Sequence, residues 1–384
     1  MKVAIFHHEI GQGSAIGRIL ARLAEGLVNS GYKVTIFTGE VTGSLERPKA
    51  HIVRIPIIKR PLVLRFLSYH LVASTVYFAR RLFLRESFNF KVGIESNWLF
   101  VDICYPHSCH RAYLKREWKE VKANMIWWLR LLRWLNHWTR SILEPVVFRE
   151  ARIVVVPSHG LAREIEEEYP FTREKIIVVP NFIDHQRWER PKFFDRADFR
   201  IKMGLAPTDI VAAFTALGAF EHKGLHLVID ALERLPTNVK LLVIGGKEHE
   251  LKAWKNKART RGLNTRVLFV GMQSDIRPFL WASDVFVFPS AKEIFPLAVL
   301  EAAAAGLPLV VTRVYGVEEF MRNEEMGYIV ERSVTSISEA LLRFANLSPE
   351  MRLVMGKRAR SAVEDYSFAS FINKWIGVLE SMRE

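Results

Sequence analysis

The stretch EIFPLAVLEA, residues 293–302, places two carboxylates eight positions apart, with a proline and an alanine-rich run between them. Pro296 suits the first turn of a helix, where its missing N–H needs no partner, so we expect Glu293 in the preceding loop and Glu301 about two turns into the helix. At ~1.5 Å of rise per residue the two carboxylates lie roughly 10 Å apart. Such a spacing suits two ends of one elongated ligand better than a shared proton.

The backbone between these two acids offers a place for an anion. The N–H groups of Phe295, Leu297 and Ala298 flank Pro296 and point out of the start of the helix. The helix dipole favours negative charge at that end, above all a phosphate. The segment therefore predicts a carboxylate, an anion-binding helix start and a second carboxylate along one bound molecule.

Length and composition indicate a globular protein of two domains. The 384 residues exceed the size at which a single core keeps growing, and the 49% apolar and 25% charged side chains are typical of folded proteins. The two cysteines, Cys104 and Cys109, are too few for a disulfide framework or a four-ligand zinc site. A reducing cytoplasm fits this usage.

The positive charge is concentrated in the first half of the chain. Residues 1–180 contain 27 basic and 16 acidic side chains, a balance of +11, whereas residues 181–384 contain 28 and 25, a balance of +3. An anionic partner is expected for the first half. Nucleic acid, an anionic membrane surface and an acidic acceptor all fit that charge.

No leader or membrane-spanning segment is expected. Residues 2–6 are predicted to form a first strand that His7 and His8 interrupt too early for a signal peptide. The longest uncharged run of the first half, residues 66–79, has 14 residues, and a bilayer span needs roughly 18 to 20.

Short β-branched runs alternate with helical patterns, which indicates a parallel α/β organisation. The first set comprises strands at 3–6, 34–38, 51–58 and 92–95, with helices at 17–30 and 61–87. A second set of strands is expected at 153–158, 176–180, 211–215, 240–244, 267–270 and 285–289. The charged, aromatic segment 182–199 has no clear period, so the domain boundary is placed near residue 185.

A tryptophan-rich amphipathic helix is predicted from about residue 124 to residue 143. Its apolar positions follow a 3-4-3-4 spacing: Trp128, Leu131, Leu135, Trp138 and Ile142. Trp127 and Trp134 flank the opposite face, which is basic and comprises Arg130, Arg133, His137 and Arg140. The pattern indicates contact with a membrane surface, and the alternative is an ordinary core helix with a solvated face.

Glycines after the first strand form the pattern GQGSAIG, residues 11–17. A dinucleotide fingerprint needs a different glycine spacing and an acid about 20 residues on, whereas Glu40 follows Gly11 by 29. The loop at Gly13 and Ser14 is either a place where backbone approaches a ligand or a plain tight turn.

The turn ALGAFEHKG, residues 216–224, joins a predicted strand to a helix. At that position the ammonium of Lys223, with help from His222, would neutralise charge on a departing diphosphate. Taken alone, Lys223 would be read as a solvated lysine beside a glycine turn. The acidic segment at 293–301 favours the functional interpretation.

His107 follows the strand-like run 102–105 and a turn fixed by Pro106. A histidine at a strand end would orient an acceptor or a sugar hydroxyl. The segment has too few acids and thiols for a metal site, and Cys109 lacks an assignable histidine that would activate it as a nucleophile.

Together these pieces resemble the retaining glycosyltransferases of family 4, which have the GT-B fold of two facing Rossmann-like domains with the active site in the cleft between them. Four segments carry the resemblance: 293–301, 219–224, PNFID at 180–184, and GYKV at 31–34. Within the family, residues 92–103 and the basic tryptophan-bearing segment after them are similar to the lipopolysaccharide core glucosyltransferases that act on heptose.

The resemblance implies three segments: an acceptor domain at 1–184, a nucleotide-sugar domain at 185–365, and a terminal helix at 366–384 that returns to the first domain. It also implies roles at the second domain's site. Glu301 would bind the ribose, Glu293 would face the donor sugar, and Lys223 would pair with the diphosphate. Other donor contacts would come from Phe295, Pro296, Leu297, His222, Gly13 and Ser14. His107 would stand at the acidic or histidine position of the first domain.

The implied activity is metal-independent transfer of a hexosyl group, without a cofactor, from a nucleotide sugar to a saccharide or lipid-linked saccharide of the cell envelope. UDP-glucose, another UDP-hexose and GDP-mannose all fit as donors. The protein would be cytoplasmic and peripheral on the inner face of the cell membrane, with no nucleic-acid partner. A basic nucleic-acid-binding protein and a sugar-nucleotide epimerase of the same fold are the alternatives.

Overall fold

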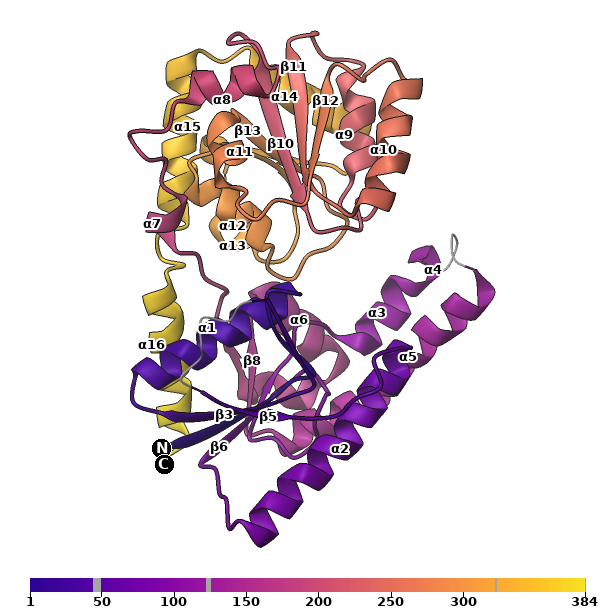
Figure 1. Cartoon of the computed structure of the whole chain (residues 1–384), viewed down its shortest axis with the longest axis vertical. Coiled ribbons are helices and arrows are strands. Elements are labelled where there is room, and N and C mark those ends of the chain that lie inside the picture. The colour runs from indigo at the N-terminus through magenta and orange to yellow at the C-terminus, as the bar shows by residue number, and fades with distance from the viewer. Residues whose placement is uncertain (44–49, 122–125, 322, 384) are drawn as a thin grey trace. The chain divides into compact units, whose positions relative to one another are not determined.

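The computed structural model describes residues 1–43, 50–121, 126–321 and 323–383 (Figure 1). The chain divides into two compact units. Unit 1 comprises Met1–Asn181 and Phe371–Glu384, and unit 2 comprises Phe182–Ser370. The sequence places the boundary at 184/185, and the contacts of the structure place it at 181/182.

Unit 1 is built on a parallel sheet that has seven strands among its described residues, in the order β5-β3-β1-β6-β7-β8-β9. The strands are β1 Lys2–Phe6, β3 Lys33–Thr38, β5 His51–Arg54, β6 Phe90–Ile94, β7 Ile103–Tyr105, β8 Ile153–Val156 and β9 Ile176–Val178. A small parallel pair, β2 Glu9–Gly11 and β4 Glu40–Thr42, lies beside it. Strands covered on both faces need apolar side chains throughout, which explains the runs of Val, Ile and Phe.

The helices of unit 1 connect these strands. They are α1 Ala15–Asn29, α2 Leu62–Phe83, α3 His110–Arg116, α4 Trp118–Val121, α5 Trp127–Glu150, α6 His159–Glu168 and most of α16 Phe368–Ser381, with a 3₁₀ turn at Pro170–Lys175. Trp375 of α16 is fully buried, with its ring 5.1 Å from that of Tyr105. The last helix therefore forms part of the core of unit 1.

Unit 2 has a second parallel sheet, with six strands within its described ranges, in the order β12-β11-β10-β13-β14-β15. The strands are β10 Ile210–Ala216, β11 Val239–Gly245, β12 Val267–Gly271, β13 Val285–Phe288, β14 Leu309–Thr312 and β15 Gly327–Val330. Its helices are α7 His185–Trp188, α8 Arg196–Lys202, α9 Leu225–Leu232, α10 Glu248–Thr260, α11 Arg277–Ala282, α12 Leu297–Ala304, α13 Val317–Phe320, α14 Val334–Ala345 and α15 Pro349–Ala362, with a 3₁₀ turn at Glu324–Met326. Two parallel sheets covered by helices are the predicted Rossmann-like domains.

Several elements differ from the sequence prediction. Strand β5 ends at Arg54 instead of residue 58, because Pro56 removes a backbone donor that a longer strand would need. The strands β14 and β15 were not predicted. Helix α5 continues through Pro145 to Glu150, and the residues 124 and 125 at which the prediction begins lie outside the described residues.

By length and composition, α2 is long and apolar enough to cross a bilayer, with a mean hydropathy of 1.4. One side of it nevertheless belongs to the core of unit 1. Tyr69 and Ala73 are fully buried, and the Tyr69 hydroxyl donates a hydrogen bond to the Phe37 carbonyl (2.7 Å).

A largely buried acid, 14% exposed, joins three elements of unit 2. The carboxylate of Asp284, which precedes β13, accepts hydrogen bonds from Arg196 (2.5 Å) and Arg200 (2.6 Å) of α8 and from the backbone N–H of Val211 in β10 (2.7 Å). The Arg200 side chain is only 5% exposed. Breaking a buried ion pair from one side leaves a charge without compensation, which costs several kcal/mol.

We expect Asp284→Asn to lower the free energy of unfolding of unit 2 by about 3 kcal/mol, because the buried Arg200 loses its counter-charge. Urea denaturation of the full chain measures this change. The control is Asp198→Asn, since the Asp198–Lys202 pair is 53% and 70% exposed and its loss costs less than about 1 kcal/mol. Equal effects of the two substitutions would contradict the expectation.

Candidate active site

In unit 2 the strand order reverses beside β10, whose neighbours are β11 on one side and β13 on the other. In open parallel sheets, ligands bind beyond the carboxyl ends of the strands at such a reversal, because the loops there diverge and leave a crevice. The loop after β10 carries Lys223, and the loop after β13 carries Glu293. The sequence-predicted residues thus come from the two strands that flank the reversal.

The turn after β10 has a constrained backbone. Ala219 has a φ of 57°, in the left-handed region that non-glycine residues rarely adopt. Gly224 has a φ of 82°, and a Cβ there would lie 2.3 Å from the Pro289 carbonyl oxygen. Only glycine permits this close approach, which brings the turn against the end of β13.

An ion pair connects the two loops. The ammonium of Lys223 contacts Glu293 Oε1, which also accepts a hydrogen bond from Ser290 Oγ (2.8 Å). The two side chains are 23% and 13% exposed, so the pair is largely shielded from water. The Lys223 ammonium also lies 5.5 Å from the centre of the Phe288 ring. These contacts fix a cation at the carboxyl end of the sheet.

Backbone contacts hold the same two loops together. The Ala291 N–H donates to the His222 carbonyl (3.0 Å), and His222 Nε2 lies 3.3 Å from the Lys292 carbonyl. The hydroxyl of Thr312, at the end of β14, donates to the Ser290 carbonyl (2.6 Å). Three neighbouring strand ends therefore support one site.

The helix predicted at Pro296 is α12. Pro296 is its N-cap and not part of its first turn, so the helix begins one residue later than predicted. Glu301 lies on α12 and is half-buried. Phe295 is buried, and Gly316 packs so closely that a Cβ there would lie 2.7 Å from the Phe295 Cα atom. The start of α12 is thus fixed by packing, with Leu297 as the first helical residue.

In unit 1, polar side chains gather where β1, β6 and β7 end. His7 follows β1, and its Nδ1 accepts a hydrogen bond from the amide of Asn97 (3.0 Å), which follows β6. His107 follows β7, and its ring lies 4.4 Å from that of Tyr105. Among the described residues, His107 Nε2 and the hydroxyl of Ser96 are buried and lack a hydrogen-bond partner. Buried polar atoms of this kind suit a hydroxyl-rich ligand or ordered water.

The histidines of this edge are held neutral. Burial lowers the pKa of His107 to about 4 although Glu95 opposes the shift, and burial with the charge of Arg65 lowers the pKa of His8 to about 3. Burial and the neighbouring His8 keep the pKa of His7 well below its ordinary value. A neutral imidazole both accepts and donates hydrogen bonds, which suits it to orient a hydroxyl group.

Glu95 was not predicted as a site residue, yet it anchors this edge. It has a φ of 53° and pairs with Arg140 (2.8 Å) and His110 (3.7 Å). Burial alone would raise the pKa of Glu95, but the hydrogen bond from His110 and the charge of Arg140 outweigh it and hold the pKa well below its ordinary value. The site therefore holds a permanent carboxylate.

Helix α5 turns its polar side toward the core and its apolar side outward. The predicted membrane contact of Arg140 is therefore wrong, because its side chain is 8% exposed and engaged with Glu95. His137 also faces inward, with its Nδ1 3.0 Å from His110 Nδ1, and burial together with His110 lowers its pKa to about 3. In contrast, Trp127 and Trp128 are 73% and 47% exposed.

The other basic and aromatic residues predicted on this helix lie outside the core. Trp138 is 43% exposed, and Trp134 is half-buried with its ring stacked 5.5 Å from that of Trp138. Arg133 is exposed, and Arg130 is half-buried. The apolar stripe is thus not the core face of an ordinary helix, which was the alternative interpretation.

The glycine loop after β2 has a structural function of its own. The Ser14 hydroxyl caps α1 by accepting the Gly17 N–H (3.0 Å), and the Gly13 N–H donates to the Thr42 hydroxyl (2.7 Å). A Cβ at Gly13 would lie 2.4 Å from a carboxylate oxygen of Glu9. A donor contact of Gly13 and Ser14 stays a prediction.

Two other features of the described chain offer less to catalysis. Cys104 and Cys109 are free and buried, and burial raises the pKa of both thiols, so neither is a ready nucleophile. No group of three or more His, Cys, Asp or Glu side chains suited to a metal ion occurs in the residues that the structure describes.

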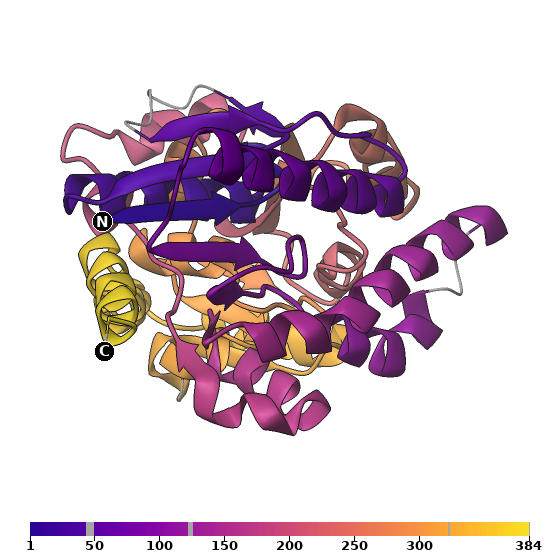
Figure 2. The same ribbon diagram turned by 90° about the horizontal axis from the view of Figure 1, so that it is seen from below.

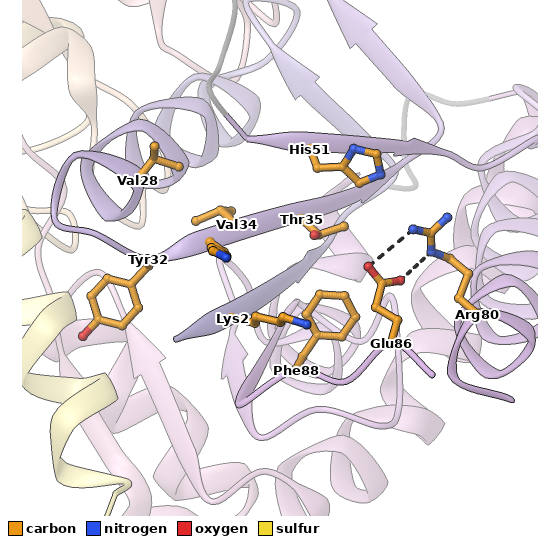
Figure 3. Close-up of a pocket in the computed structure, with 10 residues that line it drawn as sticks. Lys2, Val28, Tyr32, Val34, Thr35, His51, Arg80, Glu86 and Phe88 are labelled. Carbon is orange, nitrogen blue, oxygen red and sulfur yellow. Dashed lines mark hydrogen bonds and ion pairs between the residues drawn. The ribbon is translucent and has the colours of Figure 1, made fainter. Parts of the chain in front are cut away.

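A cavity of about 430 Å³ lies at the other edge of the unit 1 sheet, at the amino ends of β1, β3 and β5 (Figure 3). Its lining includes Lys2, Tyr32 and His51, and the Arg80–Glu86 ion pair (2.6 Å) closes one side. Because the strand ends that bind ligands in parallel sheets are the carboxyl ends, this cavity is not the candidate site.

Comparison with known proteins agrees with this geometry. The model of the family "Glycosyltransferase Family 4" matches residues 16–187, and that of "Glycosyl transferases group 1" matches residues 196–362. The chain belongs to the GT-B glycosyltransferases of family 4. One model covers most of unit 1 and the other most of unit 2.

Two curated relatives of this family 4 chain are described as sugar transferases. Over 188 residues it is 36% identical to the lipopolysaccharide core biosynthesis glycosyltransferase LpsE of Rhizobium meliloti, covering 48% of this chain and 51% of the relative. Over 201 residues it is 30% identical to the UDP-Gal:alpha-D-GlcNAc-diphosphoundecaprenol alpha-1,3-galactosyltransferase of Escherichia coli, covering 49% of each. The matches thus span about half the length of these relatives.

Among solved structures, WaaG, a glycosyltransferase involved in lipopolysaccharide biosynthesis, has the same fold with a TM-score of 0.80 and 18% identity, over 98% of this chain and 99% of that one. Anabaena HepE in complex with UDP and glucose gives a TM-score of 0.72 with 16% identity, over 99% and 100% of the two chains. At these identities the likeness concerns the fold.

The pKa values in unit 1 of this family 4 glycosyltransferase predict acid sensitivity. An unfolded histidine binds a proton near pH 6.5, whereas folded His107 does so only near pH 4. Acid therefore favours the unfolded state, and the stabilisation present above pH 6.5 is lost as the pH falls toward 4. Each such histidine contributes a slope of at most about 1.4 kcal/mol per pH unit.

We expect His107→Gln to reduce the slope of the unfolding free energy against pH by up to about 1.4 kcal/mol per pH unit, the contribution of one proton. Urea denaturation of the full chain between pH 7 and 4.5 measures this slope. The matched control is His249→Gln on the exposed surface of α10, which should leave the slope unchanged. An identical slope in the wild type and His107→Gln would contradict the expectation.

Proposed function

We propose that this protein is a retaining, metal-independent glycosyltransferase that moves a hexosyl group from a nucleotide sugar, UDP-glucose or a similar donor, to a saccharide of the cell envelope. The observation that carries the proposal is the Lys223–Glu293 pair beside the start of α12, at the strand reversal of unit 2. Relatives described as lipopolysaccharide core and undecaprenol-linked sugar transferases support the same class of reaction.

The donor is proposed to bind unit 2 along the segment from Glu293 to Glu301. Glu301 would accept the ribose hydroxyls, because a carboxylate binds two neighbouring hydroxyl groups well. The start of α12 at Leu297 would receive the diphosphate, since unpaired N–H groups and the helix dipole favour an anion there. His222, beside Lys223, would add a second donor near the same phosphates.

Lys223 is proposed to stabilise the leaving group. As the glycosidic bond breaks, negative charge grows on the diphosphate, and a fixed ammonium lowers the energy of that state without reorganising. Glu293 holds the ammonium in place and shares its charge in the structure as it stands. A diphosphate near Lys223 would compete for this charge and free Glu293 to face the hydroxyls of the sugar.

Retention needs no enzyme nucleophile in this proposal. The acceptor hydroxyl would attack the face from which the diphosphate leaves, and a leaving phosphate oxygen would take the proton of that hydroxyl. The protonated thiols of Cys104 and Cys109 fit a mechanism without a covalent enzyme intermediate.

The acceptor is proposed to bind unit 1 at the carboxyl ends of β1, β6 and β7. The neutral imidazole of His107 would orient a sugar hydroxyl, and Ser96 would provide another polar contact. Glu95 supplies a buried negative charge that strengthens donors around it. This edge supports the binding of a hydroxyl-rich molecule more than that of a nucleic acid, whose phosphates need exposed cations.

The acceptor is further proposed to be lipid-linked, with the protein in the cytoplasm and peripheral on the inner face of the cell membrane. The exposed Trp127, Trp128 and Trp138 of α5 support this, because indole rings favour the headgroup region. The Escherichia coli relative, a galactosyltransferase that acts on a diphosphoundecaprenol-linked sugar, supports the same kind of acceptor.

Replacing Lys223 or Glu301 by Ala should reduce transfer in different ways. We expect Lys223→Ala to lower kcat by about 10²–10³-fold, because it acts on the leaving group, as donors to a developing anion do in other enzymes. Glu301→Ala should instead weaken donor binding at least tenfold. Steady-state kinetics and thermal shift with UDP-glucose, UDP-galactose and GDP-mannose measure both effects.

The control is Lys252→Ala on the exposed face of α10, which should leave both quantities unchanged. Near-normal turnover in Lys223→Ala would count heavily against the site. Conversion of the donor sugar without an acceptor would favour an epimerase, and salt-sensitive retention on DNA without any response to nucleotide sugars would favour a nucleic-acid-binding protein.

A further inference from the structure

The outer face of α2 is apolar and exposed. Its inner residues, at 3-4-4 spacing, are buried in unit 1: Phe66, Tyr69, Ala73 and Tyr77. Its outer stripe is 42–72% exposed: Leu64, Leu67, Leu71, Phe78 and Leu82. A helix on the surface of a soluble domain normally has polar residues on that side, so α2 has two apolar faces and only one is covered.

Helix α5 has an outer stripe of the same kind, 42–48% exposed: Trp128, Leu131, Trp138, Ile142 and Val146. Its inner face is polar and buried. There Arg140 pairs with Glu95, and Glu144 accepts the N–H groups of His110 (2.5 Å) and Arg111 (3.1 Å) at the start of α3. Because these contacts fix the rotation of α5, the apolar stripe cannot turn inward without breaking them.

The two stripes lie on the same side of unit 1. Helix α2 leads from β5 to β6, and α5 lies between β7 and β8, so both connections run toward the β9 edge of the sheet. Right-handed crossovers that run in one direction place their helices on one face. The helices α2 and α5 are in contact (Figures 1 and 2). The Arg140 guanidinium of α5 lies 4.4 Å from the centre of the Phe66 ring of α2.

We propose that the outer stripes of α2 and α5 together insert into the headgroup and upper acyl region of an anionic lipid bilayer, with both helices lying along the membrane plane. The ten residues of the two stripes are called the α2–α5 surface below. The proposal extends the membrane part of the proposed function to a second helix, and it does not depend on the chemistry of glycosyl transfer.

The charges around the α2–α5 surface match an anionic bilayer. Helix α2 carries no acidic residue, and Arg81 in its last turn is exposed, whereas Arg65 and Arg80 are paired with Glu9 (3.2 Å) and Glu86 (2.6 Å). The acids of α5 are Glu144, which is buried, and Glu150, which is the last helical residue. Basic residues beside an apolar stripe attract anionic headgroups, and the apolar side chains then enter the acyl layer.

A lipid surface fits better than the other occupants of an apolar face. A second copy of unit 1 would bring a second positive balance, +11 over residues 1–180, toward the first, whereas an anionic bilayer supplies the opposite charge. Helix α2 lies on the bilayer and does not cross it, because its inner face is committed to protein. The Trp98 indole donates to Ser74 (3.0 Å), in addition to the Tyr69 contact with Phe37.

Sedimentation of the full chain with phosphatidylcholine vesicles containing phosphatidylglycerol tests the proposal. We expect the wild type to bind. Part of the bound protein should stay on the vesicles in 0.5 M NaCl, because salt screens the attraction between charges but not apolar insertion. Leu71→Glu/Phe78→Glu on α2 should reduce the partition coefficient at least tenfold, and Trp138→Glu/Ile142→Glu on α5 should do the same. The matched control is Leu353→Glu/Val354→Glu on α15, at positions 60% and 48% exposed, which should bind as the wild type does.

A labelling experiment gives a second measure that needs no charge substitution. The native Cys104 and Cys109 are buried, so a solvatochromic thiol dye should label Leu71→Cys selectively. Its emission should shift to the blue with anionic vesicles, whereas the dye on Leu353→Cys should not respond.

Three results would overturn the proposal: wild-type binding by the α2 double variant, no blue shift at Leu71→Cys, or a wild-type dimer that the α2 double variant abolishes in solution. The α2 double variant should retain wild-type transfer to a soluble saccharide acceptor. Its failure to bind vesicles would therefore leave the glycosyltransferase proposal intact, and the loss of transfer in Lys223→Ala tests that proposal separately.

Discussion

The ion pair between Lys223 and Glu293 depends on the parallel alignment of β10 and β13, which brings these two residues, 70 positions apart in the chain, to one edge of the sheet. The strand order reverses beside β10, so the loops that follow the two strands meet there. Unit 1 uses the same constraint, since His7, Glu95 and His107 each follow a parallel strand. Both groups of polar residues are thus products of parallel sheets, which need no long loop to assemble them.

Helix α5 has the reverse of the usual amphipathic arrangement. Burying Arg140 and Glu144 costs desolvation energy, which is tolerated only because Glu95 compensates the charge of Arg140 and hydrogen bonds from α3 satisfy Glu144. The same contacts hold the polar residues at the carboxyl ends of β1, β6 and β7, and they turn the tryptophans of α5 outward. Site geometry and surface chemistry are therefore set by one helix.

Much of the fold follows from the sequence, because buried parallel strands appear as short β-branched runs and Pro296 marks the start of α12. The orientation of α5 and the role of Glu95 could not be predicted from such local patterns. Helical spacing defines the two faces of α5 but not which of them is buried, so Arg140 was placed on the wrong side. Glu95 directly follows the apolar run of β6, a signal that was available, but its partners come from residues 110 and 140, whose proximity only the tertiary structure provides.

The return of α16 to unit 1 bears on the order in which the chain can fold during synthesis. Unit 2 is continuous from Phe182 to Ser370, whereas unit 1 needs Trp375 beneath Tyr105 to complete its interior. A ribosome releases those residues after all of unit 2. Unit 1 is therefore completed only after unit 2 has been made, and until then the surface that Trp375 covers is exposed to chaperones or to aggregation.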